Sequence, residues 1–470
     1  MFAALQERNY RLYFSGSILS NIGTWMQRVA QDWLVLELSG GSALAVGITT
    51  ALQFLPTLVL AGVTGLAADR FDKRTVLRVT QAWMAASAIV LGVLAMTGAA
   101  QTWHVFAIAL VFGVGSAFDI PARQSFVPEV VGPAKLPNAI ALNSAAFNTA
   151  RLIGPAVAGL VIANFGSGVA ILSNGISYLA FILALSMFDS SKLQRSVRVK
   201  RGKRQIREAL SYVRHRRDIL LILGVTFFIG TFGLNFQMTS ALMATEIYGK
   251  GAEEYGILGT IMAIGSLTGA LVGARRKESP RLRFFLVMAV AFGVMTVVSG
   301  VMPTYVTYAI TLPFVGVCSM LAMNAANTIV QLSVDPQLRG RVMALYVLVM
   351  MGGTPIGAPL LGVFGQLLNA RFMLIIGGGV VVVGTLVVMV LLAHRQGIMI
   401  STELSPYLHW RPGRTTEVAA ATAAEEPAEI TVPDEGRDRT DPTAEFPSYP
   451  PASADPHPRH REGRGGTEVR

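Results

Sequence analysis

The fold is decided by the stretch Gly65-Leu-Ala-Ala-Asp69-Arg70-Phe-Asp72-Lys73-Arg74-Thr-Val-Leu77, a short charged segment between two long apolar ones at 44–68 and 76–98. Each apolar segment has the length, about 20 residues, that an α-helix needs to cross a bilayer. Lysine and arginine mark the loops of a membrane protein that stay in the cytoplasm. The stretch therefore predicts two transmembrane helices joined by a cytoplasmic turn.

The same alternation continues on both sides of this loop. Six apolar segments precede a polar break at 189–217, and six follow it. Basic residues gather in every second gap between the apolar segments. In the remaining short gaps, the basic residues are only Lys250 and Arg371. This pattern predicts an all-α membrane protein with twelve transmembrane helices in a bacterial plasma (inner) membrane, with both termini in the cytoplasm.

The composition agrees with a lipid environment. The chain has 470 residues, of which 52% are hydrophobic and only 14% are charged, and its mean hydropathy is +0.51. Soluble domains carry about 25% charged residues, so this chain has too few charges to cover a water-facing surface. Cys318 is the only cysteine, which excludes an intrachain disulfide and a thiol metal cluster. We expect no metal and no cofactor.

The net charge of +11 comes mostly from the polar break, which carries eleven Lys and Arg against Asp189 and Glu208. Because apolar spans adjoin the break on both sides, we expect it to lie beside anionic lipid headgroups and not to bind nucleic acid. The last residues are rich in Pro, Ala, Glu, Asp and Arg, so they are predicted to be disordered. The predicted organisation is a six-helix bundle, a basic cytoplasmic linker, a second six-helix bundle and a disordered cytoplasmic tail, at 1–188, 189–217, 218–394 and 395–470.

The two predicted bundles resemble each other in sequence. Three features recur after 203 residues: Pro133-Ala-Lys-Leu as Pro336-Gln-Leu-Arg, Ala141-Leu142 as Ala344-Leu345, and Gly154-x4-Gly159 as Gly357-x4-Gly362. The bundles are therefore predicted to be parallel repeats, and such repeats form a substrate site between them near the bilayer midplane. Alternating access follows when one half rocks against the other.

Polar side chains inside the predicted spans mark this site, because ionisable residues within a membrane are costly and usually functional. We hypothesise that Asp32 binds the coupling proton and that Arg28 and Arg151 are its charged neighbours. A permanent structural ion pair between Arg28 and Asp32, which are one helical turn apart, is the alternative. The residues expected to line the substrate cavity are Asn21, Trp25, Gln31, Gln53, Asn148, Asn235, Asn324 and Asn327.

The charged loop resembles the signature loop of the major facilitator superfamily, glycine-x-x-x-aspartate-arginine-x-glycine-basic-basic. Asp72 stands where that pattern prefers glycine, so the resemblance does not decide whether the chain makes a tight turn there. The resemblance implies that the loop acts as a conformational latch, with Asp119 and Arg123 bracing it from the fourth span. The latch residues within the loop would be Gly65, Asp69, Arg70, Lys73 and Arg74.

The fifth span, Ala150-x3-Gly154-Pro155-x3-Gly159, resembles the antiporter motif of the same superfamily. This motif favours export against protons, and ordinary helix packing through Gly154, Pro155 and Gly159 is the alternative. A closer resemblance rests on Asn9-Tyr-Arg-Leu-Tyr-Phe and Phe118-Asp119-x-Pro121-Ala-Arg123-Gln124-x-Phe-Val-Pro128-Glu129. These stretches look like the enterobactin-exporter branch, also called transmembrane secretion effectors. The resemblance runs from about residue 5 to residue 395 and implies export of siderophores or other small amphipathic molecules.

The expected function follows from these features together. The sequence contains no nucleotide-binding loop, no nucleophile elbow and no paired Cys or His cluster, so we expect neither an enzyme nor an ATP-driven pump. We expect a monomeric secondary active exporter of small amphipathic siderophore-like or drug-like molecules, working by proton antiport. An uptake symporter of the same fold, a non-transporting membrane sensor or scaffold that signals through the tail, and a lipid flippase remain as alternatives.

Overall fold

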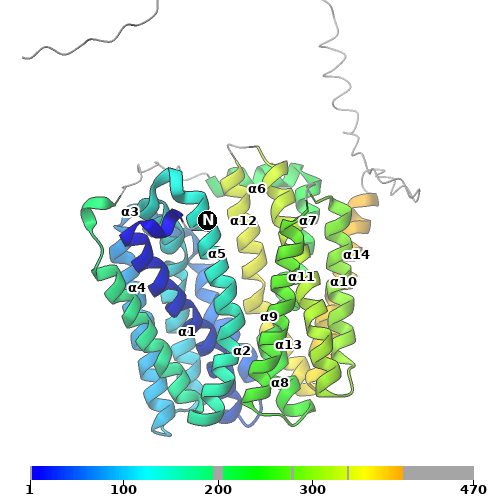
Figure 1. The fold of residues 1–470 in the computed structure, drawn as a ribbon. Helices are drawn as coiled ribbons and strands as arrows, with labels where there is room; N and C mark the ends of the chain where they lie inside the picture. Colours follow the sequence, from blue (N-terminus) through cyan, green and yellow to red (C-terminus); the bar gives the residue numbers. More distant parts are fainter. Residues whose placement is uncertain (1–2, 194–204, 277–279, 336–337, 395–470) are drawn as a thin grey trace, which may run out of the picture. The chain divides into compact units, whose positions relative to one another are not determined.

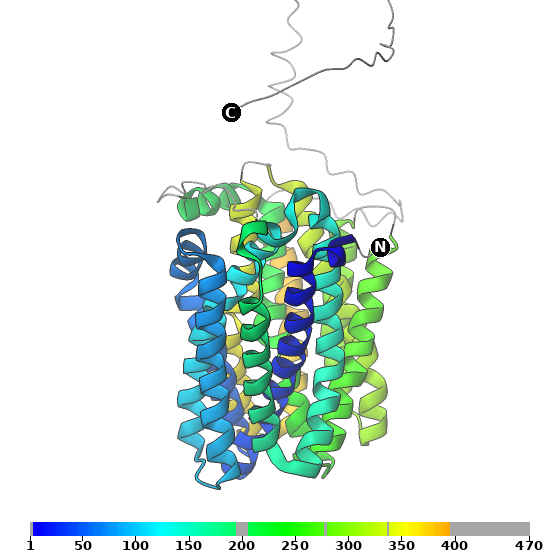
Figure 2. The ribbon, with the colours of Figure 1, turned by 60° about the vertical axis from the view of Figure 1, so that its left-hand side comes forward.

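Every regular element in the described part of the chain is a helix (Figures 1 and 2). The computed structural model describes residues 3–193, 205–276, 280–335 and 338–394, all within one compact unit, Met1–Ile400. The predicted tail at 395–470 and part of the predicted linker, 194–204, lie outside the described residues. The all-helical architecture predicted from the apolar segments is confirmed.

The elements follow one another in this order: η1 (Ala3–Gln6), α1 (Arg8–Leu38), α2 (Ala43–Val59), α3 (Ala61–Arg70), α4 (Lys73–Met96), α5 (Thr102–Ser186), η2 (Ser190–Lys192), α6 (Gln205–His215), α7 (Arg217–Phe228), η3 (Ile229–Gly233), α8 (Phe236–Leu242), η4 (Met243–Ile247), α9 (Ala252–Ala274), α10 (Leu282–Gly300), α11 (Tyr305–Ser333), α12 (Arg339–Gly352), α13 (Thr354–Leu367) and α14 (Ala370–His394). We call α1–α5 the N-terminal half and α7–α14 the C-terminal half.

Eight segments among the described residues are long and apolar enough to cross a membrane. One of them, α5, has 85 residues and departs from helical geometry at Gly132 (φ 71°) and Gly166 (φ 82°). Glycine adopts positive φ without the steric cost that other residues meet, so the chain reverses there and α5 contains three antiparallel passes (Figure 2). With α1 and the joined α2–α3, the arrangement is consistent with the twelve predicted spans.

Three spans are interrupted along their length. Helix α2 gives way to α3 at Leu60, four residues after Pro56, and α12 gives way to α13 at Gly353. The span that begins with α7 contains two π-helical turns, η3 and η4. Proline removes a helical hydrogen bond, and π-helical turns occur mostly at functional sites. These interruptions all lie in helices that face the boundary between the two halves.

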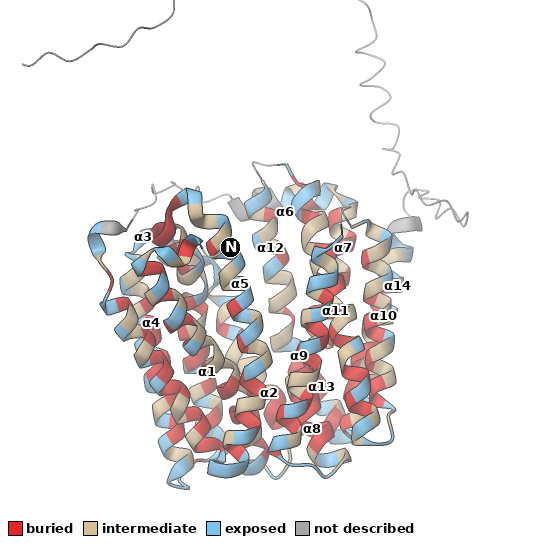
Figure 3. Cartoon of the chain, viewed as in Figure 1, coloured by how far each residue is buried: buried red, intermediate tan, exposed pale blue. Residues whose placement is uncertain are grey.

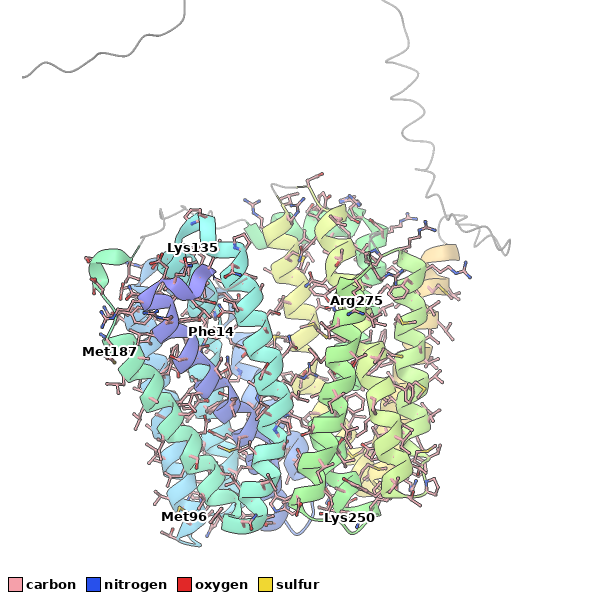
Figure 4. The ribbon with its side chains drawn as sticks, viewed as in Figure 1. Phe14, Met96, Lys135, Met187, Lys250 and Arg275 are labelled. Carbon is pink, nitrogen blue, oxygen red and sulfur yellow. The ribbon has the colours of Figure 1, made fainter. Side chains whose placement is uncertain are left out.

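Labelled side chains identify the two ends of the helical bundle (Figure 4). Lys135 and Arg275 lie toward one end, which we call the basic end, and Met96 and Lys250 lie at the opposite end. The linker helix α6 lies at the basic end and packs against α7 and α12 (Figure 1). Arg216, which follows α6, donates to Asp218 at 2.7 Å, and this bond raises the pKa of Arg216 above its ordinary value.

The two halves contact each other through glycines near the opposite end. A Cβ on Gly47 would meet the carbonyl oxygen of Ala358 at 2.6 Å, and one on Gly256 would meet that of Pro155 at the same distance. A continuous cluster of buried apolar residues also crosses the boundary there, from Leu34 in α1 to α9 and α13. Close approach of helices at small residues is the usual packing mode in lipid.

Toward the basic end, the packing stays within each half. A second apolar cluster, built around Tyr13, Phe126 and Phe181, belongs to the N-terminal half alone. Helix α3 packs on α4 and α5 of its own half, and a Cβ on Gly62 or Gly65 would meet no atom within 4 Å. The described halves are therefore joined at the opposite end and separate toward the basic end.

The predicted internal repeat is visible in these contacts. Gly154 packs against α1 of its own half at Trp25, and Gly357 packs against η3 at Thr231. Five residues further on, Gly159 packs across the boundary against Ala252 in α9. Its counterpart Gly362 packs across the boundary against α2. Equivalent glycines thus make equivalent contacts within and between the halves, as two parallel repeats require.

The outward faces of the bundle are apolar, as a lipid-facing surface must be. Large side chains such as Leu160, Phe165 and Val387 are exposed there, while buried residues line the inward faces of the helices (Figure 3). Helix formation also satisfies the backbone polar groups internally, which lipid cannot do. The fold places its polar side chains between helices and between the two halves.

Candidate functional site

Asp32 lies where α1 of the N-terminal half meets α9 of the C-terminal half. Its side chain is buried, and its carboxylate interacts with the hydroxyl of Tyr255 in α9 and with the guanidinium of Arg28. The approach to Tyr255 is looser than a full hydrogen bond, because that hydroxyl has no partner with hydrogen-bonding geometry among the described residues. A titratable carboxylate therefore sits in the contact that joins the two halves.

Aromatic stacking also joins α1 to α9 at this place. The indole of Trp33 in α1 stacks on the ring of Tyr255, with ring centroids 6.2 Å apart and planes inclined by 19°. Trp33 also donates its indole N–H to Glu37 at 2.7 Å. One further bond crosses the boundary nearby, from the Thr260 hydroxyl to the carbonyl of Leu152 at 3.4 Å. Separation of the halves at this end would break all of these contacts.

The ion pair between Arg28 and Asp32, given above as the alternative, is absent from the described residues. The Arg28 guanidinium lies instead over two aromatic rings, 4.9 Å from the centroid of Trp25 and 5.3 Å from that of Phe54. Its Nε atom is buried without a hydrogen-bond partner among the described residues. The aromatic faces of Trp25 and Phe54 attract the cation, so in this structure Arg28 makes cation–π contacts in place of the alternative permanent ion pair.

Arg151 joins this cluster from the middle pass of α5. Its guanidinium lies 5.6 Å from the centroid of Trp25, and Phe147 meets the same indole edge-on at 5.8 Å. Trp25 therefore lies within cation–π distance of both Arg28 and Arg151. The structure brings together three of the predicted residues in this way, and it adds Phe54 and Phe147.

The helical repeat shows which way Arg151 points. Pro155 contacts Gly256 and Gly259 in the C-terminal half. Arg151 and Asn148 precede Pro155 by four and seven residues, which places them on the same helix face. They therefore face the other half, on the basic-end side of the point where the halves meet. The amide of Asn148 donates only to its own helix, at the Ser144 carbonyl.

The remaining predicted cavity residues are more scattered. Asn21 donates to Ser17, Asn235 donates to Thr231 in the turn before it, and Asn324 lies near Gly273 within the C-terminal half. Both amide atoms of Gln31 are buried without a partner among the described residues. Gln53 and Asn327 are half-buried, and Asn327 accepts from Gln331. Among the described residues, the hydrogen bonds given for Asn21, Asn235 and Asn327 all stay within their own spans.

The charged loop between α3 and α4 is tied to its own half. Asp72 accepts from the backbone N–H of Thr75 at 2.9 Å and caps α4, so the position that the family pattern gives to glycine needs no glycine here. Lys73 pairs with Glu129 of α5 at 2.5 Å. Arg74 donates to the carbonyls of Leu185, Ser186 and Phe188, which end α5.

Two latch predictions need comment. Gly65, one of the predicted latch residues, is surrounded by open space, because a Cβ there would meet no atom within 4 Å. Arg70 is exposed at the end of α3. The Asp69 side chain lies outside the described residues. The hydrogen bonds and ion pairs described for Lys73 and Arg74 all lie within the N-terminal half.

Asp119 and Arg123 form a buried polar network rather than part of the loop. They pair at 2.5 Å. Asp119 accepts from Thr80 and Gln81 of α4 at 3.0 and 2.8 Å, while Arg123 donates to Ser17 and Ser20 of α1. The network braces the helix that follows the loop, and it holds three helices of the N-terminal half together.

Replacing Asp119 with asparagine should destabilise the chain strongly, because it leaves the buried Arg123 charge unpaired. Breaking a buried pair typically costs about 3–5 kcal/mol, whereas an exposed pair contributes at most about 1 kcal/mol. The control is Lys135→Met, which removes the exposed pair between Lys135 and Glu7. Thermal unfolding in detergent, followed by thiol labelling of Cys318, should separate the two variants. Equal melting temperatures would contradict the bracing role.

Two functional residues were missed by the sequence analysis. Glu129 stands inside the quoted stretch that ends at Pro128-Glu129, so its position was noticed but its pairing with Lys73 was not. Tyr255 carries no sequence signal, because a tyrosine in an apolar span is most often a packing residue. Among the described residues no group of His, Cys, Asp and Glu could hold a metal ion.

Comparison with protein families gives a match over most of the chain. The profile described as transmembrane secretion effector matches residues 1–424. The match extends past residue 395, where the resemblance in sequence was expected to end. The resemblance itself is confirmed.

Individual proteins are similar to this chain over most of its length. The staphyloferrin A transporter of Staphylococcus aureus is 24% identical over 75% of this chain and 88% of its own length. The multidrug efflux pump Tap of Mycolicibacterium fortuitum is 27% identical with the same coverage. A bacterial homologue of the human lysosomal transporter Spinster, solved in an inward-facing and unoccupied conformation, shares the fold with a TM-score of 0.63 at 14% identity, over 82% of this chain and 95% of its own.

Proposed function

Because this chain belongs to the transmembrane secretion effector family of the major facilitator superfamily, we propose that it exports small amphipathic molecules in exchange for protons. The cargo would be siderophore-like or drug-like, and the two halves would alternate access across a bacterial plasma membrane. Efflux is part of the name of the related Tap pump, and a siderophore-type cargo is suggested by the related staphyloferrin A transporter.

We assign the basic end to the cytoplasm, because lysine and arginine collect in cytoplasmic loops. Arg70, Lys73, Arg275 and Arg339 all lie in segments that adjoin this end. On this assignment the halves are closed toward the outside and separate toward the cytoplasm. The chain would then be in the state that receives cargo from inside the cell, and it would act as a monomer.

The observation that carries proton antiport is the position of Asp32 in the contact that joins the halves. An ionised carboxylate is costly to bury without a paired cation, whereas a protonated one is not. Asp32 has no ion-pair partner among the described residues. Proton binding from the outside would let the contact with Tyr255 close, and proton release to the cytoplasm would let it open again.

The charged loop would stabilise one of the two states of this cycle. In the present state α3 packs on α4 and α5, Lys73 pairs with Glu129 of α5, and Arg74 donates to the Leu185 carbonyl near the end of α5. When the basic end closes, Gly62 and Gly65 offer a side-chain-free surface for the approaching half. We propose that Gly65, Asp69 and Arg70 then latch the cargo-releasing state.

Efflux from cells tests the proposal. A strain lacking other exporters, with and without the chain, is loaded with a panel of siderophores and drugs, and their loss is followed with and without a proton uncoupler. We expect faster loss of at least one compound from cells that contain the chain, and the uncoupler should abolish that difference. Accumulation instead of loss would identify an uptake transporter. Efflux that survives the uncoupler would contradict proton antiport.

A further inference from the structure

We propose that the cargo is an organic anion with an aromatic or apolar body, and that Arg28, Arg151 and Trp25 bind it. This inference rests on the proposed export function and specifies its substrate class. It starts from an arrangement that the export function does not require: two arginine guanidiniums that share one indole ring, at 4.9 and 5.6 Å from its centroid.

The charge of this cluster is not balanced by the protein. Neither Arg28 nor Arg151 makes an ion pair among the described residues. Asp32 is the one acid that interacts with Arg28, and it offers at most one negative charge against two positive ones. Asp119, the other aspartate of this half that is buried among the described side chains, is committed to Arg123 at 2.5 Å. At least one positive charge is therefore left for a ligand.

Burying cations without partners is costly, and charged residues inside a membrane mark substrate pathways. The cluster also lies on such a pathway. Arg151 faces the C-terminal half beside the Pro155 contact, on the side where the halves separate. A guanidinium there presents several N–H donors in a planar fork that matches a carboxylate or phosphate. A purely structural stack would need only one of the two arginines.

The aromatic part of the cluster suits the rest of such a cargo. Phe147 is 49% exposed although its ring meets Trp25 edge-on at 5.8 Å, so an accessible apolar side chain adjoins the indole that both guanidiniums contact. Aromatic rings stack favourably on one another in offset or edge-on geometry. The site therefore pairs an anion-binding group with an adjacent apolar surface, which is the chemistry of an amphipathic acid.

The test uses three probes with one aromatic body: naphthylacetate, naphthylacetamide and naphthylethylamine. The full-length chain is reconstituted in liposomes, and efflux of each probe is measured under a proton gradient. We expect the anion to be exported at least about tenfold faster than the other two, because only the anion accepts charge-assisted hydrogen bonds from the guanidiniums. Arg151→Gln and Arg28→Gln should each remove that preference.

Two further variants separate recognition from folding. Arg151→Lys keeps the charge and should retain part of the preference for the anion, while Arg11→Gln changes an exposed arginine of the same helix as Arg28 and should retain all of it. The inference is overturned if the amide or the amine is exported best, or if the glutamine variants slow all three probes equally. It also falls, while the export function stands, if none of the three moves but another compound of the efflux panel does.

Discussion

Asp32→Asn should abolish proton-driven efflux and leave the folded chain intact. The asparagine side chain has nearly the same shape and can still meet the Tyr255 hydroxyl, but it cannot bind and release a proton at neutral pH. The contact between α1 and α9 would then close and open independently of the proton gradient. We expect efflux against a cargo gradient to fall to the rate of membranes without the chain.

Exchange of cargo across the membrane separates a coupling defect from a folding defect. In liposomes without a proton gradient, Asp32→Asn should still exchange labelled cargo for unlabelled cargo, because the halves can still rock. The matched control is Glu37→Gln on the same helix, where the acid is exposed and bonded only to Trp33 and Ser167 among the described residues. Full coupling in Asp32→Asn would show that another group carries the proton.

Gly256→Leu should abolish transport by a different route. A Cβ at this position would lie 2.6 Å from the Pro155 carbonyl oxygen and 2.9 Å from the Gly159 Cα. Both neighbours are backbone atoms that cannot rotate aside, and overpacking of a tight contact costs about 1–3 kcal/mol or more. The opposite end could then no longer close, and the chain would remain open toward the outside.

Thiol accessibility reports this change directly, because Cys318 is the only native cysteine and can be replaced by serine. A cysteine at Thr260, which bonds to Leu152 across the boundary, should be protected from an external reagent in the otherwise native chain. Gly256→Leu should expose it. The control is Gly379→Leu, where a Cβ would meet nothing within 4 Å. Protection that persists in Gly256→Leu would mean that the glycine contact does not govern closure.

The fold was predictable because lipid imposes simple rules on sequence. Long apolar segments had to be helices, and the alternation of basic loops gave the order of the passes. The repeat of Gly154-x4-Gly159 as Gly357-x4-Gly362 predicted two similar halves, and both glycine pairs make equivalent contacts in the structure. What the pattern could not give was where the spans are interrupted, at Leu60 between α2 and α3 and at the π-helical turn η3, which packs on α12, α13 and α14.

The candidate site was predictable only in part. The polar residues of the first span were expected to include Trp25, Arg28 and Asp32, and the structure places the Arg28 guanidinium 4.9 Å from the Trp25 ring centroid. Spacing within one helix cannot reveal partners on another, so it missed the Phe54 ring that holds Arg28 and the Tyr255 hydroxyl that meets Asp32. For Arg28 it left an ion pair with Asp32 open as the alternative, whereas the structure places the guanidinium over the rings of Trp25 in α1 and Phe54 in α2.

The central claim is that protonation of Asp32 controls which end of the bundle is closed. Spin-label distances test it in lipid nanodiscs, in a Cys318→Ser background, with one label pair at Asn164 and Lys250 and another at Ala134 and Arg275. Because a protonated carboxyl is less costly to bury than an ionised one, acidic buffer should shorten the first distance and lengthen the second. Alkaline buffer should do the reverse, and Asp32→Asn should remove the response. Distances that do not respond to pH in the otherwise native chain, or that respond equally in Asp32→Asn, would contradict the claim.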